Sequence, residues 1–208
     1  MILTIRDITS EICEEGKFLG YPTTYVNVQG CNLNCKYCSI TDKKRKRMGV
    51  QTILNYIFKM GNNKVVIRGG EPLLQEAIYI IVYELVDRGY EVMIESNGTV
   101  AIDETLYKRS YGYALKLRTP SSGTSSMNNY NNLERLLCHD EVWFRINDYN
   151  DYVFARDIMN KYPTKASYIL IAMDIEILDQ LNDWLLEDKL NKTKINKGEI
   201  KKWITQRN

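Results

Sequence analysis

The 208-residue sequence lacks any apolar run that approaches the length of a membrane span, so we do not expect a membrane protein. Residues 1–9 lack the basic-then-apolar pattern of a secretory signal peptide, which indicates a cytoplasmic location. The net charge is only +2, so charge alone gives no indication of a nucleic-acid partner. No internal repeat or linker divides the sequence, and we expect one domain that covers residues 1–208.

Cysteine is scarce except in one stretch. Three of the five cysteines, Cys31, Cys35 and Cys38, lie within eight residues at a Cys-x-x-x-Cys-x-x-Cys spacing, unlike a secreted disulfide framework. Thiolates suit both iron–sulfur clusters and zinc. A [4Fe–4S] cluster held by three thiolates would leave one iron open to another molecule. A structural zinc ion would instead need Cys13 or the single histidine, His139, as its fourth ligand.

Short apolar runs alternate with helical patterns from residue 23 onward, which is typical of a parallel α/β fold. The predicted strands are residues 23–28, 64–68, 91–95, 113–117, 141–146 and 168–172. The predicted helices are residues 51–60, 73–88, 133–138, 152–162 and 175–188. About six mostly parallel strands favour a partial (β/α) barrel over a closed barrel of eight strands.

Polar or glycine-rich motifs come directly after four of these strands. They are the cysteine loop, residues 69–72 (Gly-Gly-Glu-Pro), residues 96–97 (Ser-Asn) and residues 121–123 (Ser-Ser-Gly). The carboxyl ends of parallel strands meet at one edge, so we expect these motifs to converge there. The glycines would let the backbone approach a ligand, and Glu71 would accept hydrogen bonds from a cationic amine. A tight turn with Pro72 in the first turn of a helix is the alternative.

The cysteine motif, with the aromatic residue Tyr37 before its last cysteine, and the Gly-Gly-Glu-Pro segment together resemble the radical S-adenosylmethionine (SAM) superfamily. The resemblance implies that the amino and carboxylate groups of SAM chelate the open iron. Reduction of the cluster would then cleave SAM to methionine and a 5′-deoxyadenosyl radical, which abstracts hydrogen from a substrate.

A narrower resemblance covers most of the chain. Residues 15–16, 20–22, 28–33, 69–75, 95–99 and 120–123 resemble the 7-carboxy-7-deazaguanine synthase family. This implies ring contraction of 6-carboxy-5,6,7,8-tetrahydropterin with loss of ammonia, on the route to queuosine. It also implies a homodimer and a reductant such as flavodoxin. The implied cofactor-binding residues are Tyr37, Ser39, Gly69, Gly70, Glu71, Ser96, Asn97, Ser121 and Ser122.

The substrate side of the pattern departs from that family. The substrate-binding candidates by position are Cys13, Glu14, Glu15, Asn27 and Arg68. Asn27 stands where the family has an arginine that binds the substrate carboxylate, and Arg68 replaces a threonine that contacts the substrate. Arg68 either takes over the carboxylate, because guanidinium groups bind carboxylates bidentately, or faces solvent.

The residues expected to bind Mg²⁺ also depart from the family pattern. The family usually has Asp and then Thr or Ser after the last cysteine, and this second residue contacts Mg²⁺ through its hydroxyl. This chain has Ser39 and Ile40 instead, and Ile40 offers no oxygen ligand. Residues 43–47 are all basic, which favours a solvated loop over a surface that attracts an anionic substrate or electron donor.

We expect residues 138–140 (Cys-His-Asp) to form a turn at a helix end.

Three functional alternatives follow from these departures. The first is a divergent relative that acts on another small anionic substrate. The second is a glycyl-radical activating enzyme, which shares the cysteines and Gly-Gly-Glu-Pro but against which the Pro-Ser-Ser-Gly segment argues. The third is a non-catalytic protein that binds an iron–sulfur cluster or zinc.

Overall fold

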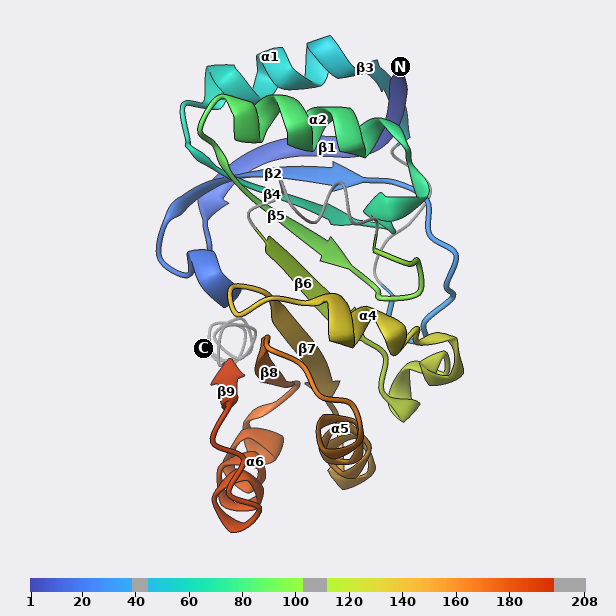
Figure 1. The fold of residues 1–208 in the computed structure, drawn as a ribbon, viewed down its shortest axis with the longest axis vertical. Helices are drawn as coiled ribbons and strands as arrows, with labels where there is room; N and C mark the ends of the chain where they lie inside the picture. Colours follow the sequence, from blue (N-terminus) through green and yellow to red (C-terminus); the bar gives the residue numbers. More distant parts are fainter. Residues whose placement is uncertain (39–44, 103–111, 197–208) are drawn as a thin grey trace, which may run out of the picture.

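The computed structural model describes residues 1–38, 45–102 and 112–196, and its centre is one sheet (Figure 1). Nine strands of the described residues follow the order β3-β1-β2-β4-β5-β6-β7-β8-β9. Their bounds are β1 (Ile2–Ile12), β2 (Pro22–Val28), β3 (Lys46–Gly49), β4 (Lys64–Gly69), β5 (Glu91–Ser96), β6 (Gly112–Leu117), β7 (Glu141–Ile146), β8 (Ser167–Ala172) and β9 (Thr193–Asn196). Strands β2 and β4 to β9 run parallel, whereas β1 is antiparallel to β2 and to β3.

The six strands predicted from the sequence are confirmed as β2 and β4 to β8. The prediction missed β1, β3 and β9. Strand β3 falls partly within the basic run, and β9 reads Thr-Lys-Ile-Asn, so neither contains an apolar run. In β1 only Leu3 and Ile5 are buried, which gives a weak alternation over eleven residues. The added strands extend both edges of the predicted sheet.

The helices of the described residues all connect strands of this sheet. Their bounds are α1 (Val50–Met60), α2 (Ala77–Asp87), α4 (Asn131–Arg135), α5 (Tyr149–Lys161) and α6 (Ile175–Glu187), with short 3₁₀ turns η1 (Gly16–Phe18), η2 (Pro72–Leu74), η3 (Pro120–Ser122) and η4 (Ser125–Met127). Helix α5 begins three residues before the predicted start, because the side chain of Asp148 accepts a hydrogen bond from the N–H of Asp151 and caps it. None of the helices in the described ranges has the length and apolar character needed to cross a membrane.

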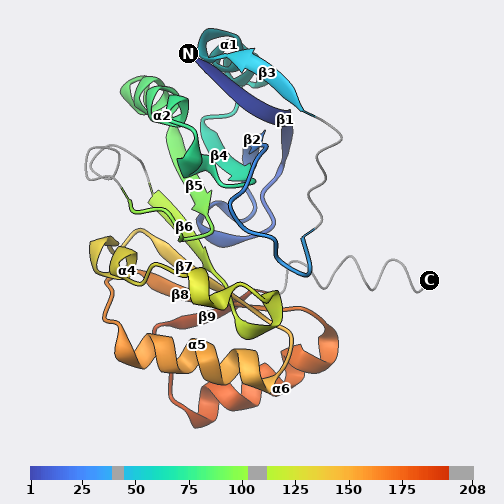
Figure 2. The ribbon, with the colours of Figure 1, turned by 90° about the vertical axis from the view of Figure 1, so that its right-hand side faces the viewer.

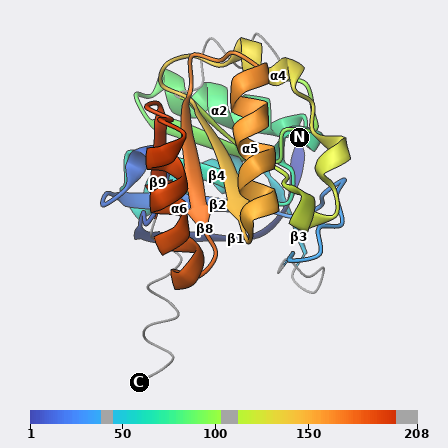
Figure 3. The same cartoon turned by 90° about the horizontal axis from the view of Figure 1, so that it is seen from below.

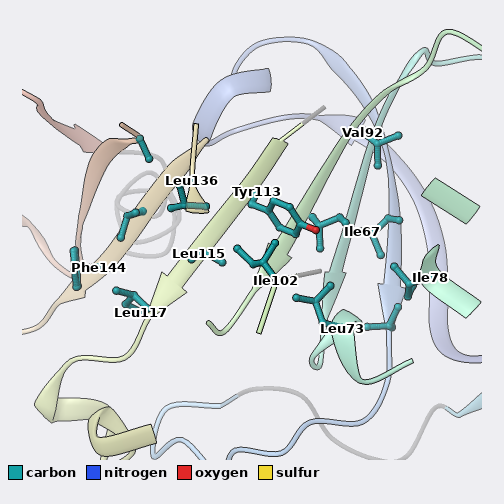
Figure 4. Packing of buried hydrophobic residues seen from close by; sticks show 14 of the residues in the cluster. Ile67, Leu73, Ile78, Val92, Ile102, Tyr113, Leu115, Leu117, Leu136 and Phe144 are labelled. Carbon is teal, nitrogen blue, oxygen red and sulfur yellow. The ribbon is translucent and has the colours of Figure 1, made fainter. Parts of the chain in front are cut away.

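Alternate residues of the strands form two separate cores. The larger one lies between the sheet and its helices, and Figure 4 shows its centre around Tyr113, Leu115 and Ile67. Helices α5 and α6 cover the β7–β9 end of the sheet (Figure 3), and α1 and α2 lie at the β1 end (Figure 2).

The smaller core lies on the opposite, inner face of the sheet. It consists of Cys13, Phe18, Tyr25, Val66, Met93, Ala114, Trp143, Ile169 and Ile171. Because side chains alternate along a strand, the residues two positions farther along these strands lie on the same inner face, closer to the carboxyl ends. The part of the inner face near the carboxyl ends therefore lies next to the cysteine loop, which follows the carboxyl end of β2.

Candidate active site

The motifs at the carboxyl ends of the strands lie against one another, which confirms the predicted convergence. The backbone N–H of Glu71, after β4, donates to the carbonyl oxygen of Gly30 at 2.8 Å. The N–H of Lys36, in the cysteine loop, donates to the carbonyl oxygen of Ser122 at 3.0 Å. Asn97, after β5, also reaches the cysteine loop. Segments from β2, β4, β5 and β6 therefore build one site.

Gly69 and Gly70 are required by the approach of two chain segments. A Cβ atom on Gly70 would overlap the carbonyl oxygen of Gly30, and one on Gly69 would overlap that of Val28. Gly69 also has a φ of +122°, which is outside the range of residues with side chains. From the sequence we expected these glycines to let the backbone approach a ligand. The structure shows that they also let the backbone of residues 69–70 approach the start of the cysteine loop.

Glu71 is fully buried and its carboxylate joins the ends of two strands. One oxygen accepts from the N–H of Leu73 at 3.0 Å and from the hydroxyl of Ser96 at 2.9 Å, and the other accepts from the N–H of Asn97 at 2.6 Å. Burial raises the pKa of Glu71, and these three hydrogen bonds act in the opposite direction. The observed contacts of Glu71 thus hold the β4 and β5 loops together.

The cysteine thiols lie at the surface, next to hydrogen-bonding groups. Cys31 and Cys38 are exposed and Cys35 is partly buried. The side-chain amide of Asn97 lies 3.5 Å from the sulfur of Cys31, and the hydroxyl of Thr124 lies 3.3 Å from that of Cys35. Donors beside thiolate ligands stabilise negative charge on sulfur and tune a bound cluster.

Tyr37 lies between the second and third cysteines. Its hydroxyl is buried, and no partner for it exists among residues 1–38, 45–102 and 112–196. The guanidinium of Arg145, from β7, lies 5.4 Å from the centre of its ring. The hydroxyl is therefore a polar group left available at the site.

The turn after β6 is held by a carboxylate from α5. Asp151 has no exposed surface, and its Oδ1 atom accepts from the N–H of Ser121 at 2.9 Å. Its Oδ2 atom accepts from both the backbone and the side-chain nitrogen of Asn147, at 3.1 and 2.9 Å. This role could not be predicted from the sequence, because Asp151 follows the turn by thirty residues.

A layer of polar side chains lies on the inner face, between the smaller core and the cysteine loop. Its members are Asn27, Arg68, Glu95, Lys116 and Arg145. Lys116 donates to Glu95 at 2.8 Å and lies 3.4 Å from Glu15, which the β1–β2 connection brings inside. Burial alone would lower the pKa of Lys116, but the two carboxylates raise it above its ordinary value. Lys116 is thus a charged, paired lysine.

Asn27 and Arg68 contact each other. Their Cα atoms pair across β2 and β4, and the Nε atom of Arg68 donates to Oδ1 of Asn27 at 3.1 Å. The Arg68 guanidinium also lies 3.7 Å above the ring of Tyr25. Arg68 is therefore an inner-face residue, and the alternative that it faces solvent is wrong.

Cys13 and Glu14 lie at the opposite ends of the strands from the cysteine loop. Cys13 is buried, its thiol donates to the carbonyl oxygen of Glu15 at 3.1 Å, and burial raises its pKa. Cys13, Glu14 and His139 line a cavity of about 820 Å³ beside the first residues of β7 and β8. This position separates Cys13 and His139 from the cysteine loop. Among the described residues, no three His, Cys, Asp or Glu side chains surround a point where one metal ion could bind.

The structure does not describe Ser39 and Ile40, on which the Mg²⁺ prediction depends. Lys43 and Lys44 of the basic run also lie outside the described residues. The turn predicted at residues 138–140 is confirmed, and Asp140 accepts there from the N–H of Tyr113 at 2.7 Å.

Comparison with known proteins supports the same family. A family model described as the radical SAM superfamily matches residues 25–109. Over 171 residues the chain is 32% identical to a Methanospirillum hungatei protein named 7-carboxy-7-deazaguanine synthase, which covers 81% of this chain and 71% of that protein.

Solved structures share the fold. The crystal structure of QueE from Escherichia coli matches with a TM-score of 0.74 and 16% identity, over 93% of each chain. The structure of Streptococcus suis SuiB bound to S-adenosylmethionine matches with a TM-score of 0.59 and 14% identity, over 79% of this chain and 48% of that one. The partial barrel is thus the fold of a wider group of proteins.

Proposed function

The chain belongs to the 7-carboxy-7-deazaguanine synthase family of the radical SAM superfamily, and from this premise we propose that it converts 6-carboxy-5,6,7,8-tetrahydropterin into 7-carboxy-7-deazaguanine. The conversion starts with abstraction of hydrogen from the pterin, contracts its ring and releases ammonia. Substrate and product differ only by that ammonia, so the conversion needs no net oxidant. The product lies on the route to queuosine.

The observation that carries the proposal is the assembly of the cysteine loop with the Pro-Ser-Ser-Gly turn. The hydrogen bond from Lys36 to Ser122 and the contact of Thr124 with Cys35 join the two segments. Many radical SAM proteins share the cysteines and Gly-Gly-Glu-Pro, whereas Pro-Ser-Ser-Gly is the more discriminating mark of this family. The contact between the cysteine loop and the Pro-Ser-Ser-Gly turn favours this reaction over glycyl-radical activation.

The residues present fit a [4Fe–4S] cluster with SAM. Cys31, Cys35 and Cys38 would hold the cluster, and Asn97 and Thr124 stand next to two of the sulfurs. The buried Tyr37 hydroxyl, without a partner among the described residues, is a polar group that a ligand can satisfy. When bound, the reduced cluster would supply the electron that cleaves SAM to methionine and a 5′-deoxyadenosyl radical.

The other residues at the carboxyl ends of the strands have positioning and binding roles in this proposal. The cofactor contacts would come from Tyr37, Ser39, Gly69, Gly70, Ser96, Asn97, Ser121 and Ser122. Glu71 would act mainly through Ser96 and Asn97, because its carboxylate oxygens already accept from these residues. On the substrate side, Glu15, Asn27 and Arg68 lie on the inner face, whereas Cys13 and Glu14 lie at the far cavity. The proposal therefore places substrate contacts on the inner-face residues.

The proposal includes a cytoplasmic protein of one domain, residues 1–208, that acts as a homodimer with a reductant such as flavodoxin. A small-molecule substrate would contact the polar side chains of the inner face. The basic run that ends at Arg47 would offer positive charge to an acidic electron donor.

Anaerobic reconstitution followed by product analysis tests the function. We expect iron and sulfide contents of one [4Fe–4S] cluster per chain, 5′-deoxyadenosine after addition of SAM and dithionite, and 7-carboxy-7-deazaguanine after addition of the pterin. Cys35→Ser should abolish all three, and Cys138→Ser, which changes an exposed cysteine outside the motif, should change none of them. Zinc without iron would contradict the radical SAM chemistry. Cleavage of SAM without the deazaguanine would point to another small anionic substrate.

A further inference from the structure

We propose that Arg68 is the carboxylate-binding residue of the substrate site and that Tyr25, Asn27 and Asp7 hold it in the orientation for this role. The inference rests on the proposed function, because it names the group of the substrate that the inner face recognises. The ligand class is a small heterocycle with a carboxylate substituent.

The guanidinium of Arg68 is fixed by two contacts. Its plane lies over Tyr25, with 3.7 Å between the guanidinium carbon and the ring centre. Its Nε atom donates to Asn27 Oδ1 at 3.1 Å. Stacking restrains the plane, and the hydrogen bond restrains rotation within that plane. Within the described part of the chain, no hydrogen bond or ion pair involves the two terminal nitrogens.

Asn27 is itself held in one orientation. It is 2% exposed, and its Nδ2 atom donates to Oδ1 of Asp7 at 2.6 Å. The carbonyl oxygen of its side chain therefore faces Arg68. A register shift of β1 between Ile5 and Asp7 brings Asp7 opposite Asn27. Asp7 accepts from Arg6 at 3.0 Å as well, so that its charge is balanced by another arginine.

The other cations of the inner layer are already paired or held. Lys116 lies within salt-bridge distance of Glu95 and Glu15. Arg145 lies near the ring of Tyr37 and has further contacts. Arg68 has no carboxylate within 4 Å among the described residues, so its positive charge is available to a ligand. A partly buried cation without a counter-charge is unfavourable, and an anionic ligand would supply that counter-charge.

The location of Arg68 matches a substrate rather than a structural anion. It directly precedes Gly69 and Gly70, and the backbone of Gly70 lies against Gly30 of the cysteine loop, so Arg68 stands at the end of β4 that adjoins this loop. Two parallel N–H groups match the two oxygens of a carboxylate, and a lysine at this position would give a point charge without that match.

A binding comparison between matched ligands tests the inference. The probes are 6-carboxypterin and its carboxamide, together with indole and purine carboxylates and their carboxamides, each titrated onto the reconstituted protein with SAM. We expect the wild type to prefer the carboxylates and Arg68→Ala to lose that preference, with carboxylate affinity about 10- to 100-fold weaker and carboxamide affinity unchanged. Arg68→Lys should restore only part of the preference. Arg88→Ala, which removes an exposed arginine directly after α2, is the matched control.

The outcomes separate this inference from the proposed function. An Arg68→Ala variant that keeps the carboxylate preference overturns the inference, even if the wild type makes the deazaguanine. A wild type that fails to turn over the pterin but prefers carboxylates in an Arg68-dependent way overturns the proposed substrate and supports the inference. A wild type without any carboxylate preference overturns the inference as well. Iron content and SAM cleavage in each variant show that the site is otherwise intact.

Discussion

The hydroxyl of Thr124 lies 3.3 Å from the sulfur of Cys35 and 3.2 Å from the hydroxyl of Ser122. The Ser122 hydroxyl donates to the carbonyl oxygen of Thr119 at 2.6 Å, so its proton is already used. When Cys35 is a thiolate it can only accept, and the Thr124 hydroxyl is then the donor. The turn after β6 thus places a hydrogen-bond donor beside a proposed cluster ligand.

The first prediction concerns the reduction potential of the cluster. A hydrogen bond to a ligand sulfur stabilises the more negative, reduced state. Thr124→Val should therefore lower the potential by roughly 20–60 mV, measured by a redox titration followed by electron paramagnetic resonance. Thr124→Ser keeps the hydroxyl and should remain close to the wild type. Equal potentials for the valine and wild-type proteins would show that Thr124 does not donate to the cluster ligand.

The second prediction concerns thiol reactivity, which depends on the thiolate. In the protein without a cluster, Cys31, Cys38 and Cys138 are exposed and should react readily with iodoacetamide. Cys13 is buried and its pKa is raised, so less of it is thiolate at a given pH and its alkylation should require a higher pH or denaturant. Peptide mapping by mass spectrometry gives the rates.

Assembly of the cluster should change this order of reactivity. Cys31, Cys35 and Cys38 should become protected, whereas Cys138 should keep its rate. Protection of Cys138 together with the other three would contradict the assignment of the cluster ligands. Rapid alkylation of Cys13 in the native protein would contradict its place in the inner core.

The third prediction concerns Lys116. Its replacement by methionine leaves Glu95 and Glu15 without their cation and should lower the free energy of unfolding by about 2 kcal/mol, less than for a fully enclosed pair because Lys116 keeps 28% side-chain exposure. Adding Glu95→Gln to the methionine variant should recover part of the loss. Lys161→Met, at an exposed site of α5, is the control. Denaturant titrations measure all four proteins.

The pH dependence of the same variant follows from the sign of the shift. The folded-state pKa of Lys116 is raised, so its stabilising contribution is complete below the unfolded-state pKa, ordinarily near 10.5, and is lost as the pH rises through the folded value. The difference in stability between wild type and Lys116→Met should therefore shrink above about pH 10.5. A difference that grows with pH would contradict the pairing.

Sequence patterns predicted the central part of this fold because each of the six strands there is an apolar run and four of them are followed by a polar or glycine-rich motif. The six central strands and the convergence of their loops needed only periodicity and the geometry of parallel sheets. Strand β1 escaped prediction because most of its side chains are partly exposed. Yet β1 supplies Asp7, which orients Asn27, so the strand with the weakest pattern supports the proposed substrate side of the site.

The roles of single polar residues were harder to predict. Glu71 has the residue type of an amine-binding group, but its three protein donors come from η2 and from the end of β5, and only the folded chain brings them together. The sequence left two possibilities for Arg68, which were carboxylate binding and a solvent-facing side chain. Alternation along a strand shows which residues share a face, but it does not show which face points inward. The contact with Tyr25 places Arg68 on the inner face, and its role in carboxylate binding stays a prediction.

The last prediction concerns Asp151, which holds the turn after β6. Its fully buried carboxylate accepts from Ser121 and from two nitrogens of Asn147. In Asp151→Asn one oxygen becomes an NH₂ group that must face an N–H donor, so the turn should loosen. We expect SAM affinity to fall roughly tenfold, because about 1–2 kcal/mol of hydrogen bonding is lost at the turn. Equilibrium binding of SAM to the reconstituted protein measures the change.

The variant should separate positioning of the turn from assembly of the cluster. Asp151 contacts no cysteine among the described residues, so iron content should match the wild type. Asp157→Asn is the matched control, because Asp157 lies on the same helix with 65% of its side chain exposed, and it should bind SAM normally. Unchanged SAM affinity in Asp151→Asn would mean that the turn is rigid without the carboxylate. Loss of iron together with SAM binding would mean that Asp151 supports the whole loop assembly, since the Lys36–Ser122 hydrogen bond joins the turn to the cysteines.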